Sequence, residues 1–290
     1  MYVSTRDAML NHTGHTDGWS ALKAMNVSAV ELHFGRERRT DGFKGADGQP
    51  YDLKTDAGLK AFQQKLKSEN VRVCALLMGN NFGGDLNEEI RWGVDAVRAA
   101  EALGAPAVRV DMVPHTKEKI DVDAFATRCI EAAKKIILET PSSKVSLAVE
   151  NHGSISNRPE FLQKIFDGVG SARMGLTLDT GNFYWYGHPI DEVYKTMERF
   201  AKYARHTHVK NIKYPESERS KQREMGWRYG DFVCPIAEGD IDHARVAKIL
   251  KSVGFIGSLC LEDESIGKAP KDQQLAVLKR DIDHLKACVG

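Results

Sequence analysis

The sequence predicts one (β/α)8 barrel that spans residues 1–290. Short apolar or β-branched runs alternate with amphipathic stretches along the whole chain, which is the pattern of an α/β protein. Eight such runs occur, and the 290 residues exceed the roughly 250 of a typical barrel by no more than its loops require. No linker, internal repeat or biased segment divides the chain into two domains.

The predicted strands are short runs rich in aliphatic residues, often closed by a polar residue. In chain order they are expected at residues 2–4, 27–34, 71–78, 107–112, 146–151, 175–180, 204–210 and 257–263. The segments between most of them have helical periodicity. Helices are expected at residues 58–70, 87–103, 123–139, 158–166, 190–202, 242–253 and 271–287.

The junctions from helix to strand carry residues that end helices. Asn26, Asn70, Gly104 and Gly254 each stand a few residues before a predicted strand. The connections from strand to helix are longer and polar, above all the segment at about 211–241. Long loops in compact domains are often lids or binding loops, and barrels place their chemistry on this face. We therefore expect this loop to lie over the active-site face.

Composition excludes several classes of protein. The 41 basic and 40 acidic residues give a formal charge of +1, so no general attraction to nucleic acid or an anionic membrane is expected. No apolar run is long enough for a membrane span, and the first residues lack the apolar core of a signal peptide. The five cysteines are widely spaced, without a CxxC pair, which argues against a disulfide framework and a cysteine zinc site and favours reduced, mostly buried thiols. A cytoplasmic protein with a small-molecule ligand is the expectation.

Four polar residues end consecutive predicted strands, from the fifth to the eighth: Glu150, Asp179, His208 and Glu262. Because side chains alternate between the faces of a strand, small residues such as Ala148 lie on the same face and suit a narrow barrel interior. Three carboxylates at one mouth repel each other unless a cation lies between them. Three oxygen donors and one imidazole suit Mn²⁺, Mg²⁺, Co²⁺ or Zn²⁺ and leave positions for substrate oxygens. The alternative is that each residue pairs singly with a Lys or Arg.

Further polar residues lie near the same predicted mouth. Lys210 shares the inward face with His208, where it can bind a substrate oxygen or form a salt bridge to Asp179 or Glu262. His152 follows the fifth strand and His33 ends the second, and both are candidates for contacts with substrate hydroxyls. Glu31 lies deeper in its strand and is expected to pair with an Arg or Lys.

An aromatic run at residues 183–186 follows the sixth strand. It fits the wall of a ligand pocket, and equally a hydrophobic plug or the interface of a homo-oligomer. The segments AVENHG, LTLDTGN, HTHVKN and LCLEDE, in this order, resemble signature segments of the xylose isomerase-like barrel superfamily, the sugar isomerases and epimerases related to D-tagatose 3-epimerase. The earlier segments VELHF and ALGAPAVRV extend the resemblance over nearly the whole chain.

The resemblance implies that Glu150, Asp179, His208 and Glu262 bind one divalent metal ion, with Mn²⁺ the first choice. It also implies that Glu150 and Glu262 act as acid and base on opposite faces of the substrate. Asn182 stands where many relatives have a histidine that touches substrate, and it is kept as a substrate-binding candidate. This departure, and the lysines that replace an arginine after the seventh strand, indicate an unusual sugar or sugar derivative.

The chemistry of the residues agrees with this implication. A metal that polarises a sugar carbonyl acidifies the adjacent C–H, so that a carboxylate can remove the proton and form an enediolate. Return of the proton gives epimerisation or isomerisation. Loss of a group from the next carbon gives β-elimination, so a dehydratase or lyase is the alternative. The segment around residues 257–267 offers little to hold a phosphate, which favours an unphosphorylated keto-sugar.

Other functions fit the same residues less well. Neither GxGxxG after the first strand nor a P-loop nor GxSxG is present. An endonuclease IV-like phosphodiesterase shares the resemblance, but such chemistry uses several metals and more histidines, and DNA binding favours a basic surface. A barrel without enzymatic activity would have to retain uncompensated buried charges, which are costly.

Overall fold

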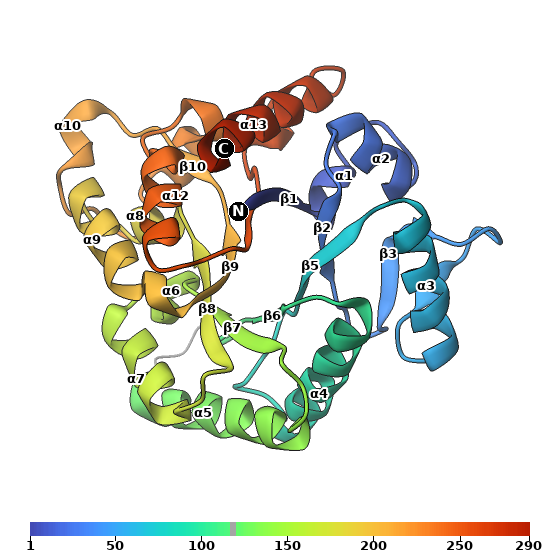
Figure 1. Cartoon of the computed structure of the whole chain (residues 1–290). Coiled ribbons are helices and arrows are strands. Elements are labelled where there is room, and N and C mark those ends of the chain that lie inside the picture. Colours follow the sequence, from blue (N-terminus) through green and yellow to red (C-terminus); the bar gives the residue numbers. More distant parts are fainter. Residues whose placement is uncertain (117–119) are drawn as a thin grey trace.

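The computed structural model describes residues 1–116 and 120–290, and its central feature is a barrel of eight parallel strands (Figure 1). The strands are β1 (Tyr2–Arg6), β2 (Ala29–His33), β5 (Arg72–Leu77), β6 (Ala107–Val110), β7 (Ser146–Glu150), β8 (Met174–Asp179), β9 (Ala204–His208) and β12 (Ser258–Leu261). They follow the order β12-β1-β2-β5-β6-β7-β8-β9, and a parallel bridge between Val209 and Leu261 links the last to the first. The predicted (β/α)8 fold class is confirmed.

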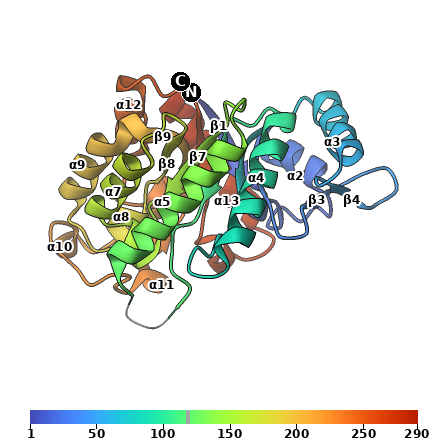
Figure 2. The same ribbon diagram turned by 90° about the horizontal axis from the view of Figure 1, so that it is seen from below.

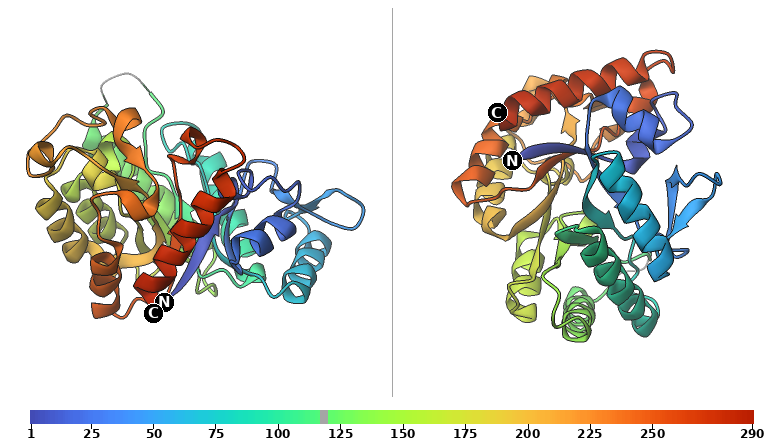
Figure 3. Two further views of the ribbon diagram at one scale, coloured as in Figure 1. Left: turned by 90° about the horizontal axis from the view of Figure 1, so that it is seen from above. Right: turned by 45° about the vertical axis from the view of Figure 1, so that its right-hand side comes forward.

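Helices surround the barrel and cover its outer surface (Figure 1). The principal ones are α2 (Gly18–Met25), α3 (Asp56–Ser68), α4 (Leu86–Leu103), α5 (Val122–Glu139), α7 (Pro159–Val169), α9 (Ile190–Phe200), α12 (His243–Ser252) and α13 (Gln274–Val289). Aspartates cap several of them: the Asp85 carboxylate accepts hydrogen bonds from two backbone N–H groups at the start of α4. α13 closes the chain and packs beside β1 (Figure 3).

The predicted helix stops are confirmed. Asn26, Asn70, Gly104 and Gly254 have φ values of 55°, 53°, 72° and 78°. These values lie in the left-handed region, which ends a helix and which Gly and Asn adopt more readily than other residues. The stops lie at the end of the barrel opposite the candidate site and set the entry into the next strand.

Two segments between β1 and α3 contain elements that are not predicted from the sequence. Residues 7–25 contain α1 (Asp7–Leu10) and α2. Both helices are too short for a helical pattern of apolar residues to be recognised in the sequence. Within residues 33–56 an antiparallel hairpin forms from β3 (Arg39–Lys44) and β4 (Pro50–Asp52) and projects from the side of the barrel (Figure 2). Its Phe43 packs edge-on against Trp19, with ring centroids 4.8 Å apart.

The segment at about 211–241 contains short elements. They are β10 (Asn211–Ile212), α10 (Glu216–Arg219), α11 (Tyr229–Phe232), β11 (Val233–Cys234) and the 3₁₀ turn η2 (Ile236–Glu238). α10 and α11 lie at the end of the barrel opposite the two chain termini (Figure 2). Asn211 fastens the segment, because its side chain donates to the carbonyl groups of Ile236 and Ile241.

The barrel interior is lined by small and polar side chains. Ala75, Ala107 and Ala148, from three strands, form a buried cluster of their own, separate from the main apolar core between strands and helices. This leaves room above them for larger polar side chains at the carboxyl ends of the strands. Among the described helices, none combines the length and the apolar character needed to cross a membrane.

Candidate metal centre and active site

Strand register brings four residues together. Glu150, Asp179 and His208 end β7, β8 and β9, and Glu262 directly follows β12. Asp179 and His208 are paired in neighbouring strands. The bridge between Val209 and Leu261 places Glu262 beside them. Ligand atoms of Glu150, Asp179, His208 and Glu262 all lie within 4.8 Å of one another, and all four side chains are buried. We call these four residues the mouth cluster.

The His208 imidazole lies at the centre of the mouth cluster. Its Nδ1 atom is 2.9 Å from Oε1 of Glu150 and 3.3 Å from Oε2 of Glu262. Its Nε2 atom is 2.9 Å from Oε2 of Glu31. Burial would lower the pKa of His208, but these carboxylates outweigh it and raise the pKa well above its ordinary value.

Each glutamate of the mouth cluster is held by an arginine through one of its oxygens. Arg109 Nε donates to Oε2 of Glu150 over 2.6 Å, and Arg6 donates to Oε1 of Glu262. Burial alone would raise the pKa of both carboxyls. Arg109 and His208 instead hold the pKa of Glu150 well below its usual range, and Lys210, His208 and Arg6 lower that of Glu262 to about 2. Both glutamates are therefore carboxylates with their second oxygen directed at His208.

Asp179 is held from the other side by the start of α8 (Asn182–Trp185). Its Oδ1 atom accepts hydrogen bonds from the backbone N–H groups of Gly181 and Asn182, at 2.8 and 2.7 Å. Its Oδ2 atom lies 3.4 Å from Lys210 Nζ and has no hydrogen-bond partner in the described parts of the chain. Burial, with the charges of Glu150 and Glu262, raises the pKa of Asp179 to about 8 despite Lys210.

The mouth cluster fits a divalent cation. Two buried oxygens, Asp179 Oδ2 and Glu262 Oε2, lack a hydrogen-bond partner among the residues that the structure describes. Unpaired buried carboxylate oxygens are costly unless a cation meets them. Neighbouring carboxylates raise the pKa of His208, and burial together with such carboxylates raises the pKa of Asp179, so both groups favour their protonated forms. A cation bound here would replace those protons.

A pocket of about 240 Å³ opens beside the mouth cluster. Its lining residues are His152, Asn182, Trp185, Lys210, Tyr229 and Glu264. The Tyr229 hydroxyl, from α11, donates to Glu264, and Lys210 is paired with the same carboxylate. Lys210 therefore connects the pocket to Asp179 in the mouth cluster.

The structure places most of the expected substrate-binding residues at this pocket. His152 lines it and is oriented by Asp111, 3.2 Å from its Nδ1 atom. Asn182 lines it with a buried Nδ2 atom that has no described partner. Lys210 lines it and also makes the salt bridges that were the alternative prediction. His33 is not among the lining residues, and its side chain is 45% exposed, 3.8 Å from Asp41.

The aromatic run has two roles. Phe183 and Tyr184 are fully buried in the core, as a plug would be, whereas Trp185 lines the pocket. Glu31 contacts Arg6 over 3.4 Å, as expected for a buried acid, and it also lies within 3.0 Å of His206 and His208.

Sequence reasoning missed several residues that hold the site. Arg6, Arg109, Asp111 and Glu264 were not named, although each contacts a residue of the mouth cluster or the pocket. For Arg109 and Asp111 the signal was available, because charged residues in the apolar run AVRVDM are expected to be inward and paired. Arg6 lay outside the predicted strand, which continues two residues further than expected.

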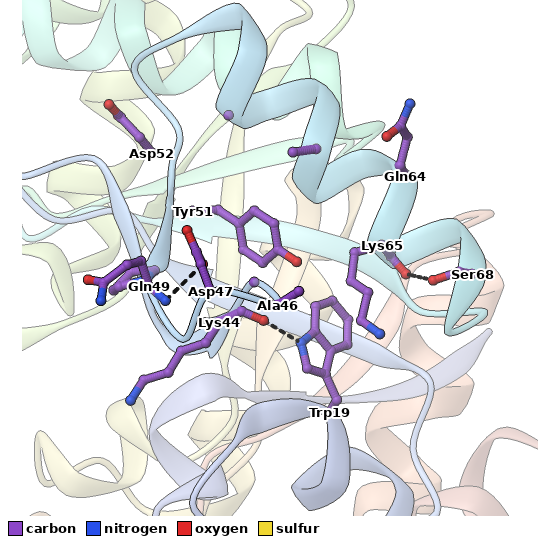
Figure 4. Close-up of a pocket in the computed structure, with 14 residues that line it drawn as sticks. Trp19, Lys44, Ala46, Asp47, Gln49, Tyr51, Asp52, Gln64, Lys65 and Ser68 are labelled. Atoms are coloured by element: carbon purple, nitrogen blue, oxygen red, sulfur yellow. Dashed lines mark hydrogen bonds between the residues drawn. The ribbon is translucent and has the colours of Figure 1, made fainter.

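A larger cavity lies elsewhere. About 880 Å³ in volume, it opens between the β3–β4 hairpin and α3, with Trp19, Tyr51 and Lys65 around it (Figure 4). The Trp19 indole N–H is already satisfied by the Lys44 carbonyl. None of the mouth cluster residues lines this cavity. The cavity beside the hairpin is larger, but the pocket at the barrel mouth lies next to the group of buried titratable side chains. That grouping identifies the barrel mouth as the candidate site.

Comparison with known proteins agrees with the fold. Residues 19–288 match the family model described as xylose isomerase-like TIM barrel. A comparison with curated protein sequences gave no match. Similar solved structures include the IOLI protein with a bound zinc atom, at 18% identity, TM-score 0.72 and 99% coverage of both chains.

Two further solved structures are similar over nearly their full lengths. D-psicose 3-epimerase from Clostridium cellulolyticum H10, determined with D-tagatose, has 11% identity, TM-score 0.71 and coverage of 100% of this chain and 99% of that one. A xylose isomerase-like TIM barrel protein from Mycobacterium smegmatis in complex with magnesium has 14% identity, TM-score 0.68 and coverage of 100% and 98%. At these identities the likeness shows the fold.

Proposed function

Because the chain belongs to the xylose isomerase-like TIM barrel family, we propose that it is a divalent-metal-dependent isomerase or epimerase of an unphosphorylated keto-sugar or sugar derivative. The metal ligands would be Glu150, Asp179, His208 and Glu262, with Mn²⁺ the first choice because three of the four donors are carboxylates. When bound, the ion would polarise the substrate carbonyl and acidify the neighbouring C–H. Under this proposal the chain acts as one barrel domain, with residues 211–241 over the active-site face.

One observation carries the proposal: Glu150 and Glu262 are anchored alike. Each gives one oxygen to an arginine and directs the other toward His208. The arginines fix the position of each carboxylate. Arg109 and His208 keep Glu150 ionised, and Lys210, His208 and Arg6 keep Glu262 ionised, which is the form that accepts a proton. One glutamate would remove the proton next to the substrate carbonyl to form an enediolate. The other, also a carboxylate at rest, would take up a proton from solvent and deliver it to the opposite face.

The pocket residues would bind and orient the sugar. Lys210 has its ammonium group between Asp179 and Glu264, and it can donate a hydrogen bond to a substrate oxygen. Asn182 offers an amide without a described partner and His152 a ring fixed by Asp111, both suited to hydroxyl groups. Trp185 and Tyr229 supply apolar surface that excludes water.

Proton exchange tests this function even when the product is unknown. The Mn²⁺-loaded protein is incubated in ²H₂O with a panel of unphosphorylated keto-sugars, and deuterium at the carbon next to the carbonyl is measured. We expect exchange with at least one sugar, and its loss in Glu150→Gln and Glu262→Gln. Asp263→Asn is the matched control, because this buried carboxylate accepts from Ser265 and is not part of the mouth cluster. No exchange with any sugar, or exchange retained in either glutamine variant, would contradict the proposal.

β-Elimination is the second candidate, and the pair formed by Tyr229 and Lys210 favours it. Both side chains lie around Glu264 in the pocket wall, where an acid could protonate a leaving group. Release of a group from the substrate in the same incubation would identify this reaction.

A further inference from the structure

A second group of potential metal ligands lies in the barrel interior, one layer below the mouth cluster. Cys74 on β5, His206 on β9 and Cys260 on β12 have ligand atoms that all lie within 4.8 Å of one another. Their exposures are 2%, 1% and 0%. His206 and Cys260 each precede a mouth-cluster residue, His208 and Glu262, by two positions, so they share its inward face.

The groups in this layer are not those of an ordinary apolar core. The sulfur atoms of Cys74 and Cys260 lie within 4.8 Å of each other. The Nε2 atom of His206 is buried and lies 3.0 Å from Oε1 of Glu31, yet it has no partner in hydrogen-bond geometry among the described residues. A buried ring nitrogen without a partner is costly, and it points to a ligand.

The other cysteines of the chain give a comparison. Cys129 is also fully buried, but it lies on α5 in the layer between helices and strands and belongs to no group of potential ligands among the described residues. A buried thiol therefore does not by itself bring other potential metal ligands close to it. The grouping of Cys74 and Cys260 with His206 on three strands is a separate feature of the barrel interior.

We propose that Cys74, Cys260 and His206 form a second metal site, for a thiolate-binding ion such as Zn²⁺. Tetrahedral Zn²⁺ with Zn–S of about 2.3 Å and Zn–N of about 2.0 Å places its ligand atoms roughly 3.5–3.8 Å apart, within the observed spread. An oxygen of Glu31 lies 3.0 Å from Nε2 of His206, so Glu31 can complete the coordination. Binding releases the thiol protons to solvent.

Metal binding at this second site would stabilise the barrel, whatever reaction takes place at the mouth cluster. The ion would join β5, β9 and β12 across the barrel, two residues below His208 and Glu262. Sulfur ligands favour softer ions, whereas the oxygen-rich mouth cluster favours Mn²⁺ or Mg²⁺. The two layers would thus select different metals.

Cobalt substitution tests this site, because thiolate-bound Co²⁺ has a near-ultraviolet charge-transfer band and an oxygen-rich site has none. We expect the band in the wild-type protein loaded with Co²⁺ alone. The Cys74→Ser/Cys260→Ser variant should lose the band and about one Co²⁺ per chain. Cys129→Ser, with an equally buried thiol, should keep both. A wild-type protein that binds Co²⁺ without the band, or a double variant that retains it, would overturn the proposal.

X-ray absorption of the Zn²⁺-loaded wild-type protein tests the second site without any substitution, so its result does not depend on whether a variant folds. We expect a sulfur shell at about 2.3 Å from zinc. A spectrum with only nitrogen and oxygen neighbours at full zinc loading would overturn the second site.

Discussion

The Nε2 atom of His208 lies 2.9 Å from Oε2 of Glu31, a residue 177 positions away in the sequence. With its Nε2–H donated to Glu31, the ring directs Nδ1 at Glu150 and Glu262. Carboxylates that hold the outer N–H of a metal-binding histidine fix its tautomer and raise its basicity. Glu31 is therefore a positioning residue for the proposed metal centre.

Replacement of Glu31 by glutamine tests this role. The amide preserves shape but removes the charge that holds the His208 ring, so we expect Mn²⁺ affinity to fall about 10- to 100-fold. Competition with a metal-binding dye measures the affinity. Asp281→Asn serves as the control, since Asp281 is an equally buried carboxylate that does not belong to the mouth cluster. Equal affinities of the wild type and Glu31→Gln would refute a positioning role.

Removal of metal should lower stability as well as activity. The mouth cluster contains three buried carboxylates that a cation would neutralise. Mn²⁺ at a hundred times its dissociation constant adds about 2.7 kcal/mol to the free energy of unfolding. Thermal unfolding after dialysis against a chelator, with and without added Mn²⁺, measures the gain. The gain should vanish in Asp179→Asn, and a gain of the same size in that variant would argue for binding elsewhere.

Gly181 allows Lys210 to pass close to the backbone before α8. A Cβ atom at this position would lie 2.4 Å from Cγ of Lys210. We expect Gly181→Ala to displace Lys210, to lower turnover and to cost about 1–3 kcal/mol of unfolding free energy. Gly267→Ala, where a Cβ meets nothing within 4 Å, should change stability by less than about 0.5 kcal/mol.

A double-mutant cycle identifies the cause of that loss. In a Lys210→Ala background the clash is absent, so Gly181→Ala should be less destabilising there by about 0.5–3 kcal/mol. Urea unfolding of the four proteins gives the coupling. Strict additivity would show that the glycine is needed for a reason other than the lysine.

Asp281 on α13 predicts a pH dependence of stability. Burial and the nearby Asp263 raise the pKa of Asp281 to about 7. Because the folded pKa exceeds the unfolded value of about 3.9, the wild type loses stability as pH rises through the interval between them. From pH 5 to 8.5 it should lose about 2–3 kcal/mol relative to Asp281→Asn. Denaturant unfolding of both proteins at the two pH values measures this, and a constant difference would contradict the raised pKa.

Much of this arrangement could be predicted from the sequence. Hydrophobic runs placed all eight strands, and positions at strand ends selected Glu150, Asp179, His208 and Glu262, which the register of a closed barrel then brings together. The partners that hold them were harder to predict. Arg6 and Glu31 come from the first two strands and meet the mouth cluster only through closure of the barrel.

Other features depend on contacts that periodicity does not encode. The position of Tyr229 over the pocket follows from the path of a long segment fastened by Asn211. The β3–β4 hairpin is short and rich in polar residues, so its strands resemble a loop in sequence. Cys74 and Cys260 were correctly expected to be buried, but their proximity requires the relative heights of β5 and β12 in the barrel.

Four side chains from four strand ends are proposed to bind one divalent ion. Anomalous diffraction from crystals soaked in Mn²⁺ can show this ion, because manganese is located independently of the protein atoms. We predict one strong peak bounded by Glu150, Asp179, His208 and Glu262. Full soaking with no peak among these residues, or with manganese bound only at another place, would contradict the account.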